Sequence, residues 1–116
     1  MEKNNLSEEE LEVLETLSNR FSRAVDILIN KVLRSLDLLE LEDISRKIDI
    51  VIRAEKRGLV DDYKLLIELK DLRNELIHEY IQEMLLEKFK EIIEKTPLLF
   101  DIANKINSYL KKYNYC

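Results

Sequence analysis

The stretch DLRNELIHEY, residues 71–80, carries the side chains of this chain best suited to chemistry on a phosphate. It holds Arg73, Asn74, Tyr80 and the only histidine of the sequence, His78. An arginine stays charged and its planar fork pairs phosphate oxygens. A histidine with an ordinary pKa of ~6.5 exchanges protons near neutral pH, and Asn74, one turn before His78, is placed to orient the imidazole. The stretch therefore has the residue types for acid–base chemistry beside a bound phosphate.

On a helical wheel with about 100° per residue, Arg73 lies at the centre of an apolar face. The residues within roughly 80° of it are Leu66, Leu69, Leu76, Ile77, Tyr80, Ile81 and Met84. Asn74 and His78 share one flank of that face. A guanidinium keeps its proton in an apolar core, so it needs a partner or a wet crevice. Two alternatives stay open: a carboxylate from another helix pairs with Arg73, or the face borders a cleft or a subunit interface.

His78 and Tyr80 also have ordinary structural interpretations. A lone histidine is most often a surface or boundary residue without a role, and a tyrosine of this kind is most often an aromatic at the edge of the core. The alternative for Tyr80 is that its hydroxyl accepts a chemical group. The company of Arg73 and Asn74 is what favours a functional interpretation of His78.

The composition predicts an all-α fold that positions this stretch. The 116 residues include one glycine, one proline and 46% apolar residues, which fits a single domain over residues 1–116 with short connections. Ser7 and Glu10 have capping-box spacing and open a long helix that ends near LLELED. Its expected apolar stripe is Leu11, Leu14, Phe21, Val25, Leu28, Val32 and Leu39.

A second helix is predicted in DISRKIDIVIRAEKRG, where Ile44, Ile48, Val51 and Ile52 are the apolar positions and Gly58 marks the end of the helix. A third helix is predicted to start at Asp61 or Asp62 and to carry the stretch DLRNELIHEY. The apolar set Leu85, Phe89, Ile92 and Ile93 comes next, either continuing that helix or starting another. Thr96 and Pro97 predict a new helix start, with Leu99, Ile102, Ile106, Tyr109 and Tyr113 lining one face of the helix that follows. The expected architecture is an antiparallel bundle of four to five helices.

The net charge of −5 argues mildly against a polyanion partner, although 19 basic residues leave room for a local basic patch. Arg53, Lys56 and Arg57, in one helical turn, are the candidates for contacts with a nucleic-acid backbone, with a solvated last turn as the alternative. The single cysteine, Cys116, excludes an intrachain disulfide or a cysteine metal cluster. No apolar run suggests a signal peptide or a membrane span, so the cytoplasm is the expected compartment.

Residues Arg73 to Tyr80 form the pattern Arg-Asn-x3-His-x-Tyr. This pattern resembles the motif of the HEPN superfamily, and most closely that of its HepT-type toxins. The resemblance covers roughly residues 53–80, including the glycine-containing turn before the motif helix. It implies a HEPN-like bundle that dimerises with two motifs facing a shared cleft. It also implies a metal-independent endoribonuclease without a cofactor, with Arg73 and His78 as the catalytic pair and Asn74 in support. A partner nucleotidyltransferase (MNT) antitoxin would neutralise it by transferring AMP from ATP to Tyr80.

One histidine per chain is a constraint on this chemistry, because RNA cleavage without a metal needs a base, an acid and positive charge on the phosphate. On a straight helix His78 points about 140° away from Arg73, so one chain brings them together poorly. A two-fold dimer supplies two copies of each residue. The alternative function is a non-catalytic helical subunit that binds a nucleotidyltransferase and presents a substrate to it. A helical bundle with neither role is a third alternative.

Overall fold

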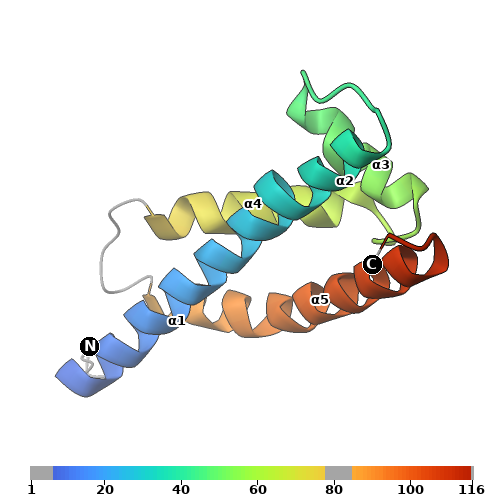
Figure 1. The fold of residues 1–116 in the computed structure, drawn as a ribbon. Coiled ribbons are helices and arrows are strands. Elements are labelled where there is room, and N and C mark those ends of the chain that lie inside the picture. Colours follow the sequence, from blue (N-terminus) through green and yellow to red (C-terminus); the bar gives the residue numbers. More distant parts are fainter. Residues whose placement is uncertain (1–6, 78–84, 116) are drawn as a thin grey trace.

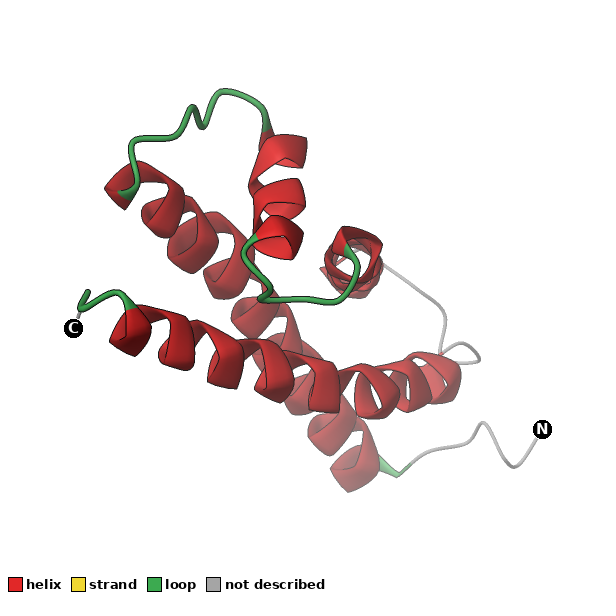
Figure 2. Cartoon of the chain, turned by 90° about the vertical axis from the view of Figure 1, so that its right-hand side faces the viewer, coloured by secondary structure: helices red, strands yellow, loops and turns green. Residues whose placement is uncertain are grey.

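The computed structural model describes residues 7–77 and 85–115 of the chain, and that part consists of helices joined by short loops (Figure 2). The first helical rod is continuous and consists of α1 (Glu8–Ile27), the π-helical segment η2 (Leu28–Leu33) and α2 (Arg34–Leu39). The rods that follow are α3 (Lys47–Lys56), α4 (Tyr63–Ile77) and α5 (Leu85–Lys112). The predicted all-helical bundle is therefore confirmed over the described residues.

The three long rods alternate in direction, as Figure 1 shows. The first rod rises from α1 to α2, α4 runs back along it, and α5 returns beneath both, while the short α3 packs against α4 and η2. The radius of gyration is 16.3 Å, against about 13 Å for a compact domain of this length. The chain is thus an elongated bundle whose helices leave much of their length accessible.

Local sequence signals fix most helix ends. Ser7 caps α1, because its Oγ accepts the Glu10 N–H at 3.1 Å while the Glu10 carboxylate accepts the Ser7 N–H at 2.9 Å. Gly58 follows α3 with a φ of +79°, the left-handed conformation expected after a helix end. Asp62 accepts the Lys64 N–H at 2.9 Å at the start of α4, so Asp62 is the capping residue of the two predicted candidates.

The predicted apolar stripe of the first rod is wrong in its second half. Val32 and Leu39 are 36% and 53% exposed, whereas Leu33 and Leu36 are buried. The cause is η2, since each turn of a π-helix holds about one residue more than an α-turn and shifts the residues after it around the axis. A count at a constant 3.6 residues per turn loses its register there.

The predicted restart at Thr96 and Pro97 is also wrong, because α5 continues through both residues. The Thr96 hydroxyl donates to the carbonyl of Ile92 at 2.6 Å, so it bonds back into its own helix instead of capping a new one. Pro97 is exposed on α5, and so is Ile93, whose carbonyl loses its helical donor because proline has no N–H. The apolar set from Leu85 to Ile93 belongs to this same helix, separate from α4.

The core is one cluster between the first rod, α3, α4 and α5. Its side chains below 2% exposure include Val25, Leu33, Leu59, Leu66, Leu69, Ile92 and Ile102. Ile50, Val51 and Ala54 are the buried residues of α3, and Ile48, expected inside, is 41% exposed. This core fixes α4 against α1, and that contact positions the first half of the motif.

Candidate functional site

Arg73 lies on the flank of the buried face of α4, not at its centre. The buried residues of this helix are Leu66, Leu69, Leu72 and Leu76. Their common direction falls near Leu69, roughly 45° from Arg73 at 100° per residue. The side chain of Arg73 is 25% exposed, so its charged end reaches the surface between α4 and α1. The predicted central position is therefore wrong for the described residues, since the wheel left out Leu72.

A carboxylate from another helix does meet Arg73, which confirms one of the two predicted alternatives. Arg73 Nη2 donates to Asp26 Oδ1 of α1 at 3.0 Å, and Nη1 donates to Asn74 Oδ1 at 2.5 Å. Asp26 is 38% exposed, so this ion pair borders solvent instead of lying in the core. Such a half-exposed pair contributes little to stability but orients the guanidinium.

Asp26 is itself held in place by α1 and η2. Asn30 Nδ2 donates to Asp26 Oδ1 at 2.6 Å. This hydrogen bond, with the charge and hydrogen bond of Arg73, keeps the pKa of Asp26 below its usual 3.8 despite the opposing effect of desolvation. Asp26 therefore remains a carboxylate at neutral pH.

Ser22, Asp26 and Asn30 recur every four residues and form a polar ridge on the first rod, beside α4. The Oγ of Ser22 is buried and has no hydrogen-bond partner among the residues that the structure describes. The sequence interpretation missed this ridge. Its signal was the S-x3-D-x3-N spacing next to the apolar stripe of the first helix.

This arrangement suits the recognition of a phosphate. A guanidinium has five N–H donors, and the bonds to Asp26 and Asn74 use two of them. The remaining donors are held in a fixed orientation by an anchored carboxylate. Arg73 thus combines a permanent charge with a defined direction at a partly exposed position.

His78 and Tyr80, the other two predicted site residues, lie outside the described residues. The structure does fix the helices on either side of them. Lys88 of α5 pairs with Glu75 of α4 at 2.6 Å, and Lys95 pairs with Glu68 at 2.8 Å. These two ion pairs hold the beginning of α5 alongside the motif helix.

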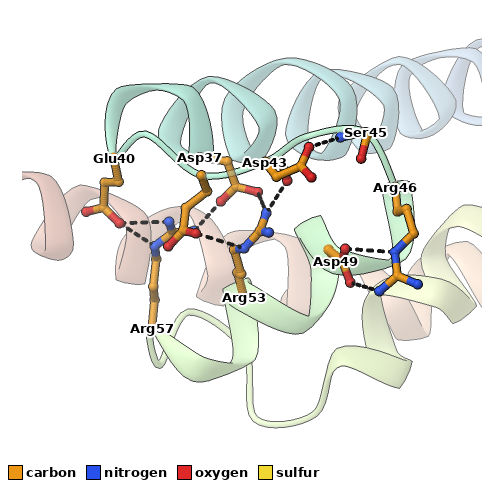
Figure 3. A network of polar contacts seen from close by, with 9 residues as sticks. Asp37, Glu40, Asp43, Ser45, Arg46, Asp49, Arg53 and Arg57 are labelled. Atoms are coloured by element: carbon orange, nitrogen blue, oxygen red, sulfur yellow. Dashed lines mark hydrogen bonds and ion pairs between the residues drawn. The ribbon is translucent and has the colours of Figure 1, made fainter.

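Arg53 and Arg57 occupy an internal ion-pair network at the far end of the first rod (Figure 3). Both contact Asp37 of α2, whose side chain is fully buried. Arg53 Nη1 donates to Asp37 Oδ2 at 2.9 Å, and Arg57 Nη1 donates to Asp37 Oδ1. Arg53 also donates to the carbonyl oxygen of Asp43 at 2.8 Å. A sequence signal for this network was available in Asp37 itself, an acid among the apolar positions of the first helix.

Arg57 extends the network to Glu40 and two tyrosines. Its Nη2 lies 2.7 Å from Glu40 Oε1, and the hydroxyls of Tyr109 and Tyr115 donate to Glu40 Oε2 at 2.7 and 2.9 Å. Burial and the bond to Glu40 raise the pKa of Tyr109 to about 12. Desolvation works against ionisation of Glu40, but the bonds from Tyr109, Tyr115 and Arg57 outweigh it and lower the pKa of Glu40.

The predicted RNA-backbone contacts need correction at two of their three residues. Arg57 is 8% exposed and Arg53 is 18% exposed, and both are bound to carboxylates. Neither offers an open guanidinium to a phosphate, and neither belongs to a solvated last turn. Lys56 is the exposed residue of the three. Burial decided this outcome, because a fully buried aspartate requires paired cations.

Comparisons with protein-family models, with curated proteins and with solved structures give no match for this chain. Over residues 7–77 and 85–115, none of the helices has the length and apolar content needed to cross a membrane.

Proposed function

We propose that this chain is a HepT-like toxin, a metal-independent endoribonuclease acting in the cytoplasm. The observation that carries the proposal is the sequence motif that begins at Arg73 of α4, together with the anchored, partly exposed guanidinium of Arg73. The residue types, their spacing and the orientation of the charge all fit a site that binds an RNA phosphate. No metal or cofactor enters the proposed reaction.

In this reaction a neutral His78 removes the proton from the ribose 2′-hydroxyl, and the 2′-oxygen attacks the adjacent phosphorus. The bond from phosphorus to the 5′-oxygen breaks, and a protonated His78 gives that leaving oxygen its proton. The products are a 2′,3′-cyclic phosphate and a free 5′-hydroxyl. Arg73 stabilises the extra negative charge on the phosphate oxygens in the transition state.

Two histidines in opposite protonation states are needed for one turnover, and each chain has one. The proposed enzyme is therefore a homodimer in which two motifs face a shared cleft. Asn74 supports the site by bonding to Arg73, and Asp26 joins it as a positioning residue that aims the guanidinium. Regulation is proposed through Tyr80, whose hydroxyl attacks the α-phosphorus of ATP on a partner nucleotidyltransferase and releases pyrophosphate. The AMP group then fills the cleft beside Arg73.

Expression of the chain without a partner tests the nuclease. Wild-type expression is expected to arrest growth, and His78→Ala and Arg73→Ala are expected to remove the arrest. The purified protein is expected to cleave RNA in EDTA and leave 2′,3′-cyclic phosphate ends. Harmless expression combined with inactivity towards RNA would refute the nuclease.

A second function, a non-catalytic subunit that binds a nucleotidyltransferase, is favoured by one observation. Arg73 is already neutralised by Asp26, as it would be in a purely structural pair. Expression of the chain alone and RNA cleavage by the purified protein distinguish the two. Incubation with the partner and ATP, followed by mass spectrometry of the peptide that contains Tyr80, tests the proposed regulation. AMP on Tyr80 with loss of cleavage supports the toxin, and an unmodified Tyr80 with AMP at another residue refutes the proposed regulation.

A further inference from the structure

A hollow of about 340 Å³ lies between the second half of α5 and the turn that follows α3 (Figure 1). The cations that line it are Arg57, Lys105 and Lys112, and no acidic residue of the described chain is among its lining side chains. Asn104 and Ser108 add an amide and a hydroxyl to the lining, and both groups donate hydrogen bonds. In a chain with a net charge of −5, this hollow is a local concentration of groups that attract an anion.

The inner wall of the hollow is held by the ion-pair network of Arg57. The contacts with Asp37 and Glu40 use the Nε, Nη1 and Nη2 of this arginine, so three of its five N–H groups are occupied. Its side chain is only 8% exposed. Tyr109, another lining residue, donates to Glu40 at 2.7 Å. Arg57 and Tyr109 therefore give the hollow a fixed wall, and the two carboxylates balance the charge of Arg57.

The net positive charge of the hollow comes from two lysines of α5. Lys105 is 34% exposed, and its Nζ lies 3.4 Å from Asp61 Oδ1 and 3.1 Å from Asp101 Oδ2. These two aspartates are 87% and 54% exposed, so solvent screens their attraction for Lys105. Lys112 forms no ion pair with another residue that the structure describes. Both ammonium groups are thus available to an anion that enters the hollow.

An aromatic ring lies next to this charge. Tyr113 lines the hollow and is 49% exposed, and its ring centre lies 4.7 Å from that of Tyr109. The Nζ of Lys112 is 5.4 Å from the ring centre of Tyr113. A flat base stacks on an aromatic side chain, and a phosphate pairs with a lysine. One small ligand that carries both groups can therefore contact Tyr113 and Lys112 together.

We propose that this hollow binds a mononucleotide, with its phosphate between Lys105 and Lys112 and its base against the ring of Tyr113. The volume of the hollow lies within the range of ~300–1,000 Å³ that is usual for small-molecule sites. An extended nucleic acid fits less well, because the exposed carboxylates of Asp61 and Asp101 beside Lys105 would repel its further phosphates.

This site is separate from the one proposed for RNA cleavage. Arg73 is bound by Asp26 of α1 and by Asn74, and none of these three residues lines the hollow. The inference therefore goes beyond the proposed function and does not rest on it.

Isothermal titration calorimetry of the full chain with AMP, adenosine and inorganic phosphate tests the proposal. AMP is expected to bind at one site per chain. Adenosine and phosphate are each expected to bind about tenfold more weakly or less, since each lacks one of the two groups that the hollow recognises. Absence of AMP binding would overturn the proposal, and so would adenosine or phosphate that binds as tightly as AMP. A single-stranded RNA that displaces AMP and binds more tightly would assign the hollow to RNA and overturn it too.

Two variants locate the binding site. Lys112→Ala is expected to weaken AMP binding about tenfold through the lost charged contact and to leave the affinity for adenosine unchanged. Tyr113→Ala is expected to weaken the binding of both ligands about tenfold, because stacking on the ring is lost. Circular dichroism checks that each variant keeps its helices. Lys112→Ala changes only an exposed side chain of the last turn, so it keeps the proposal testable if Tyr113→Ala loses helix.

The matched control is Lys111→Ala, an exposed neighbour on α5 that does not line the hollow. It is expected to bind AMP as the wild type does, and a loss equal to that of Lys112→Ala would show unspecific attraction and contradict the proposal. Arg73→Ala is also expected to bind AMP normally, so a failed nuclease assay leaves this test unaffected. Loss of AMP binding in Arg73→Ala would place the nucleotide at the motif and refute the site in the hollow.

Discussion

Asp37→Ala is expected to destabilise this protein more than any exposed charge deletion. Asp37 is fully buried and is bound by two arginines that are themselves 18% and 8% exposed. Removing one partner of a buried ion pair leaves the other charge without compensation, at a cost of about 3–5 kcal/mol. A chain of this length has a total stability of roughly 6–17 kcal/mol. The same loss corresponds to a fall in Tm of roughly 12–20 °C.

Urea unfolding followed by circular dichroism measures the effect, with an unchanged m value showing that the unfolded state is the same. Asp49→Ala is the matched control, because Asp49 also receives two bonds from one arginine, at 3.0 Å each. Its partner Arg46 is 72% exposed, however. The control is expected to cost far less than the loss of Asp37, because solvent screens an exposed ion pair. Similar losses in the two variants would refute the argument that burial of Asp37 makes the network important.

Three further outcomes follow from local features. Glu40→Gln is expected to lower the free energy of unfolding at neutral pH, where Glu40 is ionised. Because the pKa of Glu40 is lowered in the fold, its stabilising effect is lost on protonation, so the difference between variant and wild type shrinks as pH falls through and below 4.5. Urea unfolding at several pH values measures this difference. Pro97→Ala is expected to stabilise α5 by about 1–3 kcal/mol in urea unfolding, since it restores a backbone donor inside a helix. Gly58→Ala is expected to cost about 1 kcal/mol by the same assay, because an added Cβ meets nothing within 4 Å and the positive φ alone is unfavourable; Gly58→Asn is expected to cost less.

The sequence by itself determined the helices and most of their ends. Capping at Ser7, the glycine after α3 and the aspartate before α4 act within a few residues, so their effect is the same in any tertiary context. Predictions from helical periodicity and from capping residues were wrong at two places, because the same residues could also form another local structure. The first rod inserted a π-helical segment at Leu28–Leu33, and Thr96 bonded back into its own helix instead of capping the next one.

The tertiary structure alone decided which charges meet. The sequence showed that Arg73 needed a partner, and only the packing of α4 on α1 supplied Asp26, 47 residues away. Arg53 and Arg57 had the appearance of a free basic turn until α3 packed beside α2 and placed them on the buried carboxylate of Asp37. The periodicity of a sequence assigns a residue to one face of its own helix. An ion pair between helices depends on which faces of the two helices pack together, and residues far apart in the sequence carry no local pattern that shows this.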